Sequence, residues 1–145
     1  MKTLSKLLVL IAIATVLGVC DSDRDGPNMD GSRTTEIERL WMDLPSYPGL
    51  SETHSYRSSR GRNARISRQY KSAASAPDVQ SFYMREAIAR GWVFTSQKKL
   101  SDWGRDLGGF ELEFRKNDYT LDITYAGDKA DYGWNYAIGI EWYDK

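Results

Sequence analysis

The sequence predicts an α+β domain in which one main helix packs on an antiparallel sheet of about five or six strands, preceded by a short helix. Three observations carry this prediction. Residues 75–91 have the start signal, the apolar stripe and the stop signal of a helix. Residues 110–142 alternate apolar and polar side chains in three runs, and a turn sequence at 60–63 divides an extended segment. A chain of 145 residues has the length of one such domain.

Composition and charge narrow the class of protein. Hydrophobic residues make up 41% of the chain and charged residues 28%, which is typical of a globular protein. Two of the 20 basic residues and none of the 20 acidic ones lie in residues 1–19, which leaves 18 against 20, a net charge of −2, in the rest. This balance gives no reason to expect nucleic acid as a partner. Cys20 is the only cysteine, so the sequence predicts no disulfide, cysteine nucleophile or thiolate metal site in the folded part.

A short helix is expected to begin at Thr35 and to end before Pro45. Thr35 and Glu38 have the hydroxyl and carboxylate spacing of a capping box. The apolar residues after them recur at helical spacing: Ile37, Leu40, Trp41 and Leu44. Residues 20–33 are rich in Asp, Gly, Ser and Asn and are expected to form a flexible tether, so the folded domain is placed at residues 34–145.

The main helix has the clearest boundaries. Ser75 is its expected N-cap, with Pro77 in the first turn and Asp78 near the positive end of the helix dipole. The expected buried stripe consists of Val79, Phe82, Tyr83 and Ala87. Gly91 is the expected left-handed stop, and Trp92 can fold back onto the end of the helix.

The remaining regular segments are expected to be strands. Residues 51–71 favour a hairpin with its turn at 60–63. The later strands are expected at residues 92–95, 110–115, 119–125 and 134–142. Their alternation leaves one polar face, as an antiparallel sheet that is covered on one side requires. Residues 101–109 are expected to form a loop.

The first residues have the pattern of a bacterial signal peptide. Lys2 and Lys6 give a short positive region, and Leu7 to Val19 come next as 13 uncharged residues, too few for the roughly 20 that span a bilayer. Leu17-Gly18-Val19-Cys20 at its end resembles the lipobox of bacterial lipoproteins, with Val19 where the family has a small residue.

The lipobox resemblance implies a location. Residues 1–19 would be removed as a signal peptide, and Cys20 would carry a diacylglycerol on its sulfur and become the acylated N-terminus. Two or more acyl chains hold a protein firmly on a membrane. We therefore expect a lipid-anchored protein of the bacterial cell envelope that faces the periplasm or the exterior, with the choice of membrane open. An ordinary secretory signal peptide and an uncleaved anchor remain as alternatives.

The most unusual feature of the sequence is a group of six cations within fifteen residues. No acid occurs from Thr53 to Pro77. On a hairpin these cations would form a basic strip that attracts an anionic lipid surface, an anionic glycan or an acidic protein. The alternative is a solvated edge hairpin whose charges oppose aggregation. The strip consists of Arg57, Arg60, Arg62, Arg65, Arg68 and Lys71.

Other candidate residues give weaker signals. His54 is the only histidine, and without a second metal ligand or a nucleophile it is expected to be an exposed strand residue. Glu111 and Glu113 share a strand face, and Asp122 is expected across from them on the solvated side of the sheet. Paired carboxylates can hydrolyse glycosides if burial raises the pKa of one of them, which keeps a hydrolase as a third interpretation.

The loop expected at residues 102–109 contains glycines and carboxylates but lacks the Lys-Ser/Thr of a phosphate-binding loop. It is interpreted as a mobile surface loop, with a recognition loop built on Trp103 and Arg105 as the alternative. Trp103 and Tyr143 lie outside the apolar stripes and are candidates for exposed contacts.

The sequence favours a non-enzymatic protein, because no group of residues indicates a catalytic site, a cofactor or a metal. The segment from Phe82 to Trp92 and the alternating strands after it are similar to small exported bacterial domains of uncharacterised function, a resemblance that implies no activity. The leading interpretation is a lipid-anchored envelope protein that acts as a binding or assembly module. The alternative is an exported inhibitor or immunity-type protein that blocks a partner enzyme.

Overall fold

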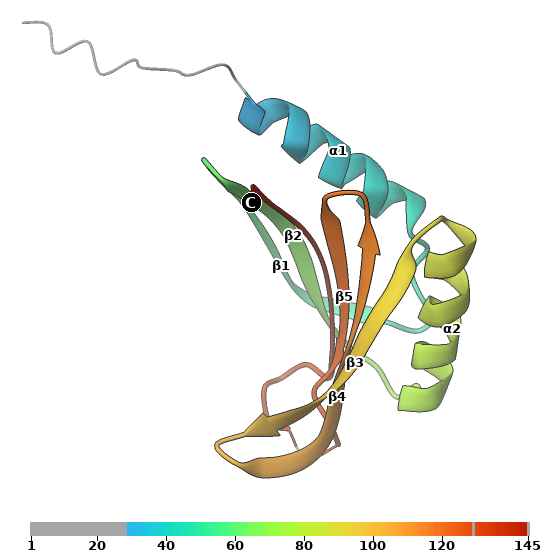
Figure 1. Cartoon of the computed structure of the whole chain (residues 1–145). Coiled ribbons are helices and arrows are strands. Elements are labelled where there is room, and N and C mark those ends of the chain that lie inside the picture. The colour runs from blue at the N-terminus through green and yellow to red at the C-terminus, as the bar shows by residue number, and fades with distance from the viewer. Residues whose placement is uncertain (1–28, 129, 145) are drawn as a thin grey trace, which may run out of the picture.

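The computed structural model describes residues 29–128 and 130–144. The predicted signal peptide, Cys20 and most of the predicted tether lie outside these residues. The described part contains two helices and one six-stranded sheet (Figure 1). The helices are α1 (Met29–Asp43) and α2 (Ala76–Ala89). The strands are β1 (Ser51–Arg60), β2 (Asn63–Lys71), β3 (Val93–Asp102), β4 (Arg105–Lys116), β5 (Tyr119–Tyr125) and β6 (Tyr136–Tyr143).

The sheet has the strand order β1-β2-β6-β5-β4-β3, and every neighbouring pair is antiparallel. Strands β3 to β6 run one after another as a meander, and β6 also pairs with β2, so that it joins the meander to the β1–β2 hairpin. Helix α2 connects β2 to the far edge strand β3. Both helices lie on the same side of the sheet (Figure 1). The structure confirms the α+β class.

The core lies between the helices and one face of the sheet. Alternate residues of β5 and β6 point into it, and in register they pair Leu121 with Ile140 and Ile123 with Ile138. Ile37 and Leu40 of α1, together with the stripe of α2, cover them. The opposite face of the sheet, which we call the open face, carries the polar residues of the alternation.

Helix α1 begins six residues earlier than the capping box predicts. Thr35 lies inside the helix, where its hydroxyl donates a hydrogen bond to the carbonyl of Gly31 at 2.9 Å. The earlier start has a tertiary cause. The guanidinium of Arg33 lies 4.8 Å from the ring of Trp142 and donates to the Tyr119 hydroxyl at 3.3 Å. Packing on the sheet therefore makes residues 29–33 helical, although their composition is that of a tether.

Helix α2 matches its prediction at both ends. The Ser75 hydroxyl accepts from the backbone N–H of Asp78 at 3.3 Å, and Gly91 has the positive φ of a left-handed stop, +80°. Trp92 is buried, and its N–H donates to the carbonyl of Ala87. One residue of the expected buried stripe differs. Phe82 is only partly buried and packs edge-on against Tyr47 and Tyr83.

The β1–β2 hairpin is confirmed with its turn between Arg60 and Asn63. The prediction of a loop at residues 101–109 is wrong. Strands β3 and β4 continue through this segment to a two-residue tip at Trp103 and Gly104. Figure 1 shows the outer half of this hairpin turning away from α2. Alternation failed to reveal the hairpin because its register shifts between Leu100 and Ser101.

Candidate functional site

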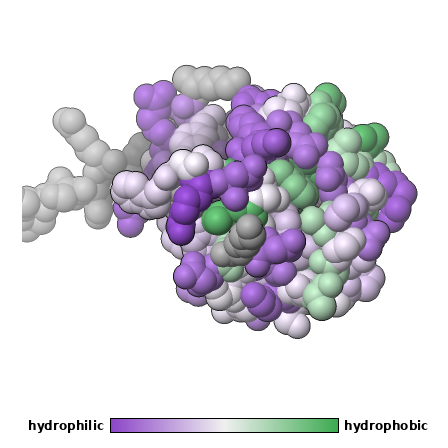
Figure 2. Space-filling model, turned by 90° about the horizontal axis from the view of Figure 1, so that it is seen from below, coloured by the Kyte–Doolittle hydropathy of each residue, from purple (hydrophilic) through white to green (hydrophobic). Residues whose placement is uncertain are grey.

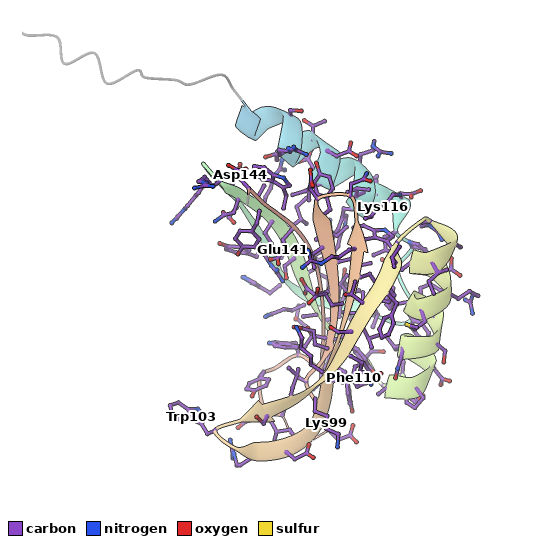
Figure 3. All side chains as sticks on the ribbon, viewed as in Figure 1. Lys99, Trp103, Phe110, Lys116, Glu141 and Asp144 are labelled. Atoms are coloured by element: carbon purple, nitrogen blue, oxygen red, sulfur yellow. The ribbon has the colours of Figure 1, made fainter. Side chains whose placement is uncertain are left out.

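The tip of the β3–β4 hairpin carries the most exposed large apolar side chain of the described chain. Trp103 is 96% exposed, and Figure 3 shows its side chain at the end of the hairpin, directed away from the rest of the molecule. Asp102 pairs with Arg105 in register, so Trp103 and Gly104 alone form the turn. An indole in this position adds nothing to the core, although burial of a side chain of this size is the largest apolar contribution a residue can make.

The backbone at the tip is unfavourable for a tryptophan. Trp103 has φ 50° and Gly104 has φ 79°. Two successive residues of positive φ are typical of a type I′ hairpin turn, which selects Asn, Asp or Gly at its first position. A large side chain at positive φ lowers the stability of the fold by roughly 1 kcal/mol or more. Residues with such strained backbone angles are common at functional sites. The tip therefore presents an aromatic side chain at the expense of stability.

A bulge determines where the tip points. The register shifts between Leu100 and Ser101, whose partners on β4 are Gly109 and Asp106, and this leaves Leu107 and Gly108 as extra residues. The carboxylate of Asp106 closes the bulge by accepting from the N–H of Gly108 at 2.8 Å. A bulge bends its strand and redirects the residues beyond the bend. The alternation of apolar and polar residues is interrupted here, which is why the segment resembled a loop.

The base of the bend is held in place by close backbone packing. Gly127, at φ +96°, lies against the carbonyl of Leu107, and a Cβ on Gly127 would overlap with it. Only glycine combines this φ with this approach. The outer hairpin is thereby fixed to the loop after β5, which gives the tip a defined direction.

A small apolar hollow of about 220 Å³ lies beside the hairpin. Leu100 and Leu107 contribute from the hairpin, and Tyr132 and Trp134 contribute from the loop before β6, where their rings stack with centroids 5.6 Å apart. Seen from below, hydrophobic side chains at this end form separate patches between hydrophilic ones (Figure 2). The exposed apolar surface of this end is thus small and localised.

The structure distributes the predicted basic strip over two sides of the hairpin. Arg57 and Arg68 lie opposite Ile66 and Ile138 in register and so face the helices. Arg60, Arg65 and Lys71 belong to the open face, and Arg62 lies in the turn. Four of the six pair with carboxylates: Arg57 with Glu38, Arg62 with Asp144, Arg65 with Asp122 and Glu141, and Arg68 with Glu52. The six residues therefore do not form one continuous cationic surface.

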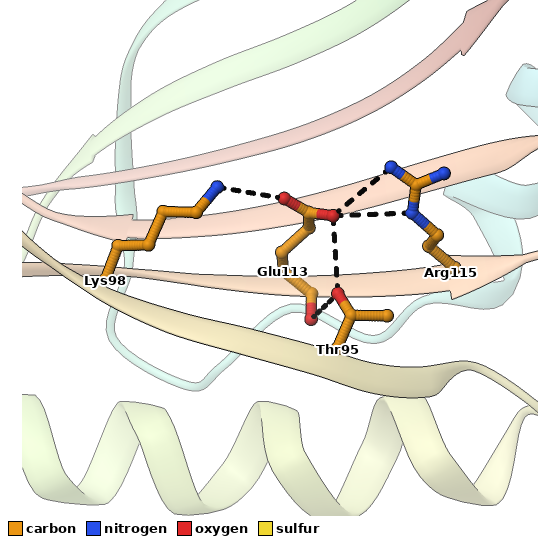
Figure 4. A network of polar contacts seen from close by, with 4 residues as sticks. All are labelled: Thr95, Lys98, Glu113 and Arg115. Carbon is orange, nitrogen blue, oxygen red and sulfur yellow. Dashed lines mark hydrogen bonds and ion pairs between the residues drawn. The ribbon is translucent and has the colours of Figure 1, made fainter.

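Glu113 lies at the centre of a polar network on the open face (Figure 4). Its carboxylate accepts from Lys98 Nζ at 3.2 Å, from the Thr95 hydroxyl at 3.3 Å and from the Arg115 guanidinium at 3.4 Å. Burial would raise the pKa of Glu113, but the hydrogen bonds and charges of Lys98 and Arg115 outweigh burial and lower it. Both oxygens of Glu113 are occupied by these contacts.

Asp122 was predicted to be solvated on this face of the sheet, but it is buried. It is only 9% exposed, although it lies on the open face. The pKa of Asp122 is raised from 3.8 to about 6; burial is the largest cause, Arg65 opposes it, and the charges of Glu141 and Glu111 add to it. Arg65 Nη2 lies 2.9 Å from one oxygen of Asp122 and 3.0 Å from the other. The interpretation of Asp122 as a solvated residue is wrong, because the ion pair with Arg65 holds it within the sheet surface.

These contacts favour a structural role for the carboxylates. Glu113 and Asp122 lie opposite each other in register, and their pKa values are shifted in opposite directions, as in an acid–base pair. Cations contact the oxygens of both residues, and these ion pairs hold the two carboxylates in place on the sheet. His54 is exposed on β1, as predicted.

Within the described residues, no three His, Cys, Asp or Glu side chains are placed to hold a metal ion. Among the described helices, none is both long enough and apolar enough to cross a bilayer. Comparison with protein-family models, with curated proteins and with solved structures finds no match to this chain.

The sequence alone indicated Trp103 and Arg105 as a possible recognition loop and Tyr143 as an exposed contact. Trp103 and Tyr143 are exposed, at 96% and 56%. The hairpin that carries Trp103 was missed. Only Gly104, at the second position of the turn, and the opposite charges of residues 102 and 105 could have indicated a two-residue turn, because Trp103 does not match the residues that such turns select.

Proposed function

We propose that the protein is an exported binding module, held at the bacterial cell envelope through a lipid on Cys20, and that it contacts a protein partner with the tip of the β3–β4 hairpin. The supporting observation is Trp103, an almost fully exposed indole held at φ 50°. Tryptophan is among the residues that dominate binding energy at the centres of protein interfaces. Trp103 lowers stability and contributes nothing to the core, so we attribute its presence at the tip to binding.

The direction of the hairpin supports a protein partner. Helix α1 begins at Met29, at the opposite end of the molecule from the hairpin tip (Figure 1). Eight residues separate Cys20 from Met29 and span at most about 29 Å when extended. A lipid on Cys20 would keep the start of α1 near the membrane and direct the tip away from it. The tip would then meet another envelope protein and not the surface of the anchoring membrane.

Site-specific photo-crosslinking tests this proposal. The full chain is produced in its host with a benzoylphenylalanine at position 103 or, as a control, at Ile88, an exposed apolar residue of α2. We expect one discrete protein adduct at position 103 and none at position 88. Added wild-type chain should compete for the adduct, and Trp103→Asn chain should not. The same adduct from both positions, or equal competition by the two chains, would contradict the proposal.

A second function, inhibition of an enzyme, is favoured by the shape of the same hairpin. A two-residue turn is the narrowest hairpin connection, and Trp103 lies at its end, so the tip can enter a concave active site. The activity of the cross-linked partner, measured with wild-type and with Trp103→Asn chain, separates the two functions. Inhibition by the wild-type chain alone would support the inhibitor, and unchanged activity of a bound partner would support the binding module.

A further inference from the structure

A second candidate site lies at the other end of the molecule, between the C-terminal half of α1 and the β1–β2 hairpin. It is a groove of about 420 Å³, within the size range of small-molecule sites. Trp41 and Met42 form the wall on α1, Ile66 lies on β2, and Ser55 and Arg57 line the groove from the edge strand. This groove shares no residue with the hairpin tip, so it is independent of the proposed function.

The groove is open because the edge strand provides no apolar cover. Helix α1 packs mainly over β2 and β6. On the helix side of β1, Ser55 and Arg57 stand where an extension of the core would need apolar residues. As a result, Met42 is 83% exposed, although it lies beside the core. Met42, together with the neighbouring Trp41, therefore forms an apolar surface that an apolar ligand can cover.

Two arginines provide the polar side of the groove. Two guanidinium groups, those of Arg57 and Arg68, and one carboxylate, that of Glu38, belong to its lining. Arg68 lies 5.0 Å from the centre of the Trp41 ring, which places a cation directly beside the aromatic wall. Glu38 pairs with Arg57, and Glu52, outside the lining, pairs with Arg68, so the charges balance and the preference for an anion rests on the guanidinium donors beside the apolar surface.

Both guanidinium groups keep donors for a ligand. Arg57 meets Glu38 through Nη2, and Arg68 meets Glu52 through Nη1 at 2.9 Å. A guanidinium has five N–H donors, so these ion pairs leave further donors on each arginine. A carboxylate accepts two of them in a bidentate contact, the strongest geometry for this pair of groups.

We propose that this groove binds a small amphipathic carboxylate. The apolar chain of the ligand lies on Trp41, Met42 and Ile66, and its carboxylate lies between Arg57 and Arg68. Two members of the predicted basic strip thus act on an anionic ligand, but as a pair in a groove and not as part of a charged surface.

Dodecanoate, used below its micelle concentration, is the probe. The protein is the chain without residues 1–19 and with Cys20→Ala, so that no attached lipid competes. Binding is followed by titration calorimetry and by backbone amide shifts in NMR spectra. We expect saturable binding with shifts concentrated at residues 38–42 and 55–57. Acetate, which lacks the chain, and dodecyltrimethylammonium, which carries the opposite charge, should each bind at least tenfold more weakly.

Two variants locate the site. Met42→Glu changes a side chain that is almost fully exposed, so it should leave the fold intact while its charge repels the ligand and weakens dodecanoate binding at least tenfold. Ile88→Glu introduces the same charge on α2, which contributes no residue to the lining of the groove, and should leave binding unchanged. Arg57→Gln with Arg68→Gln should weaken binding at least as much as Met42→Glu. The proposal is overturned if dodecanoate does not saturate, if the cationic amphiphile binds equally well, if Met42→Glu has no effect, or if the shifts lie elsewhere.

Discussion

The guanidinium of Arg65 reaches the carboxylate of Asp122 across an intervening strand, with 2.9 Å between Nη2 and Oδ1. Arg65 lies on β2 and Asp122 on β5, and the backbone of β6 passes between them at Gly139. A Cβ on Gly139 would lie 2.7 Å from Asp122 Oδ1 and would overlap with the guanidinium. The ion pair therefore depends on the absence of a side chain at residue 139.

Gly139→Ala is expected to destabilise the fold by about 1–3 kcal/mol, because the added methyl group must displace Arg65 or Asp122. The loss is measured by urea denaturation. Ser67→Ala, at the residue opposite Gly139 on β2, is the control and should change the free energy of unfolding by less than about 0.5 kcal/mol. A Gly139→Ala protein as stable as wild type would show that the ion pair does not cross the strand at Gly139.

The stability should depend on pH through Asp122. Because its pKa in the folded state, about 6, lies above the ordinary 3.8, the folded state binds this proton more tightly than the unfolded state does. Its contribution to stability is complete below pH 3.8 and is lost as the pH rises through about 6. The free energy of unfolding of wild type, minus that of Asp122→Asn, should therefore fall between about pH 4 and about pH 7. A difference that rises with pH would show that attraction to Arg65 outweighs burial.

Arg33 should stabilise the start of α1. Its guanidinium lies over the rings of Trp142 and Tyr119, 4.8 Å and 5.9 Å from their centres. Arg33→Ala is expected to lower the free energy of unfolding by about 0.5–2 kcal/mol. A chain that begins at Thr34 should show a similar loss, and Arg39→Ala, an exposed arginine of the same helix, should cost less. Equal effects of the two arginine variants would contradict the tertiary explanation for the early start of α1.

The proposed lipid anchor is tested by replacing Cys20. Cells that produce the full chain should incorporate radioactive palmitate into it, and Cys20→Ala should abolish both labelling and retention in the membrane fraction. Two or more acyl chains give firm anchoring, so loss of the only cysteine should release the chain. Membrane retention that survives in the Cys20→Ala protein would indicate an uncleaved anchor instead.

Local signals predicted the elements whose boundaries are set by single residues. Ser75 and Gly91 fix the ends of α2 through hydrogen bonds within the chain's own neighbourhood, so the sequence was sufficient there. The start of α1 was mispredicted because it depends on Arg33 reaching β5 and β6, and Tyr119 alone is 86 residues away in the sequence. The outer β3–β4 hairpin was missed because the bulge at Leu107 and Gly108 interrupts the alternation on which strand prediction relies.

In the candidate sites, too, features set by neighbouring residues were predicted, and features set by residues distant in the sequence were not. The exposure of Trp103 was foreseen because it stands outside the apolar stripes, whereas its positive φ depends on a register that only the sheet defines. The cations of β1 and β2 were visible as a run, but their partners lie far away in the sequence. Glu38 precedes Arg57, and Asp122 and Glu141 lie 57 and 76 residues after Arg65. Pairing across such separations cannot be inferred from a local window.

The Trp103→Asn protein gives the most direct test of the proposed function. Asparagine suits the positive φ at the tip, so this protein should unfold at the same or a higher urea concentration than wild type, with a gain of about 0.5–1 kcal/mol. Its affinity for the protein captured at position 103, measured by titration calorimetry beside wild type, should fall at least about 30-fold, since loss of an interface tryptophan costs about 2 kcal/mol or more. Lower affinity at undiminished stability would establish Trp103 as a binding residue. Wild-type affinity in the Trp103→Asn protein would contradict the proposed function.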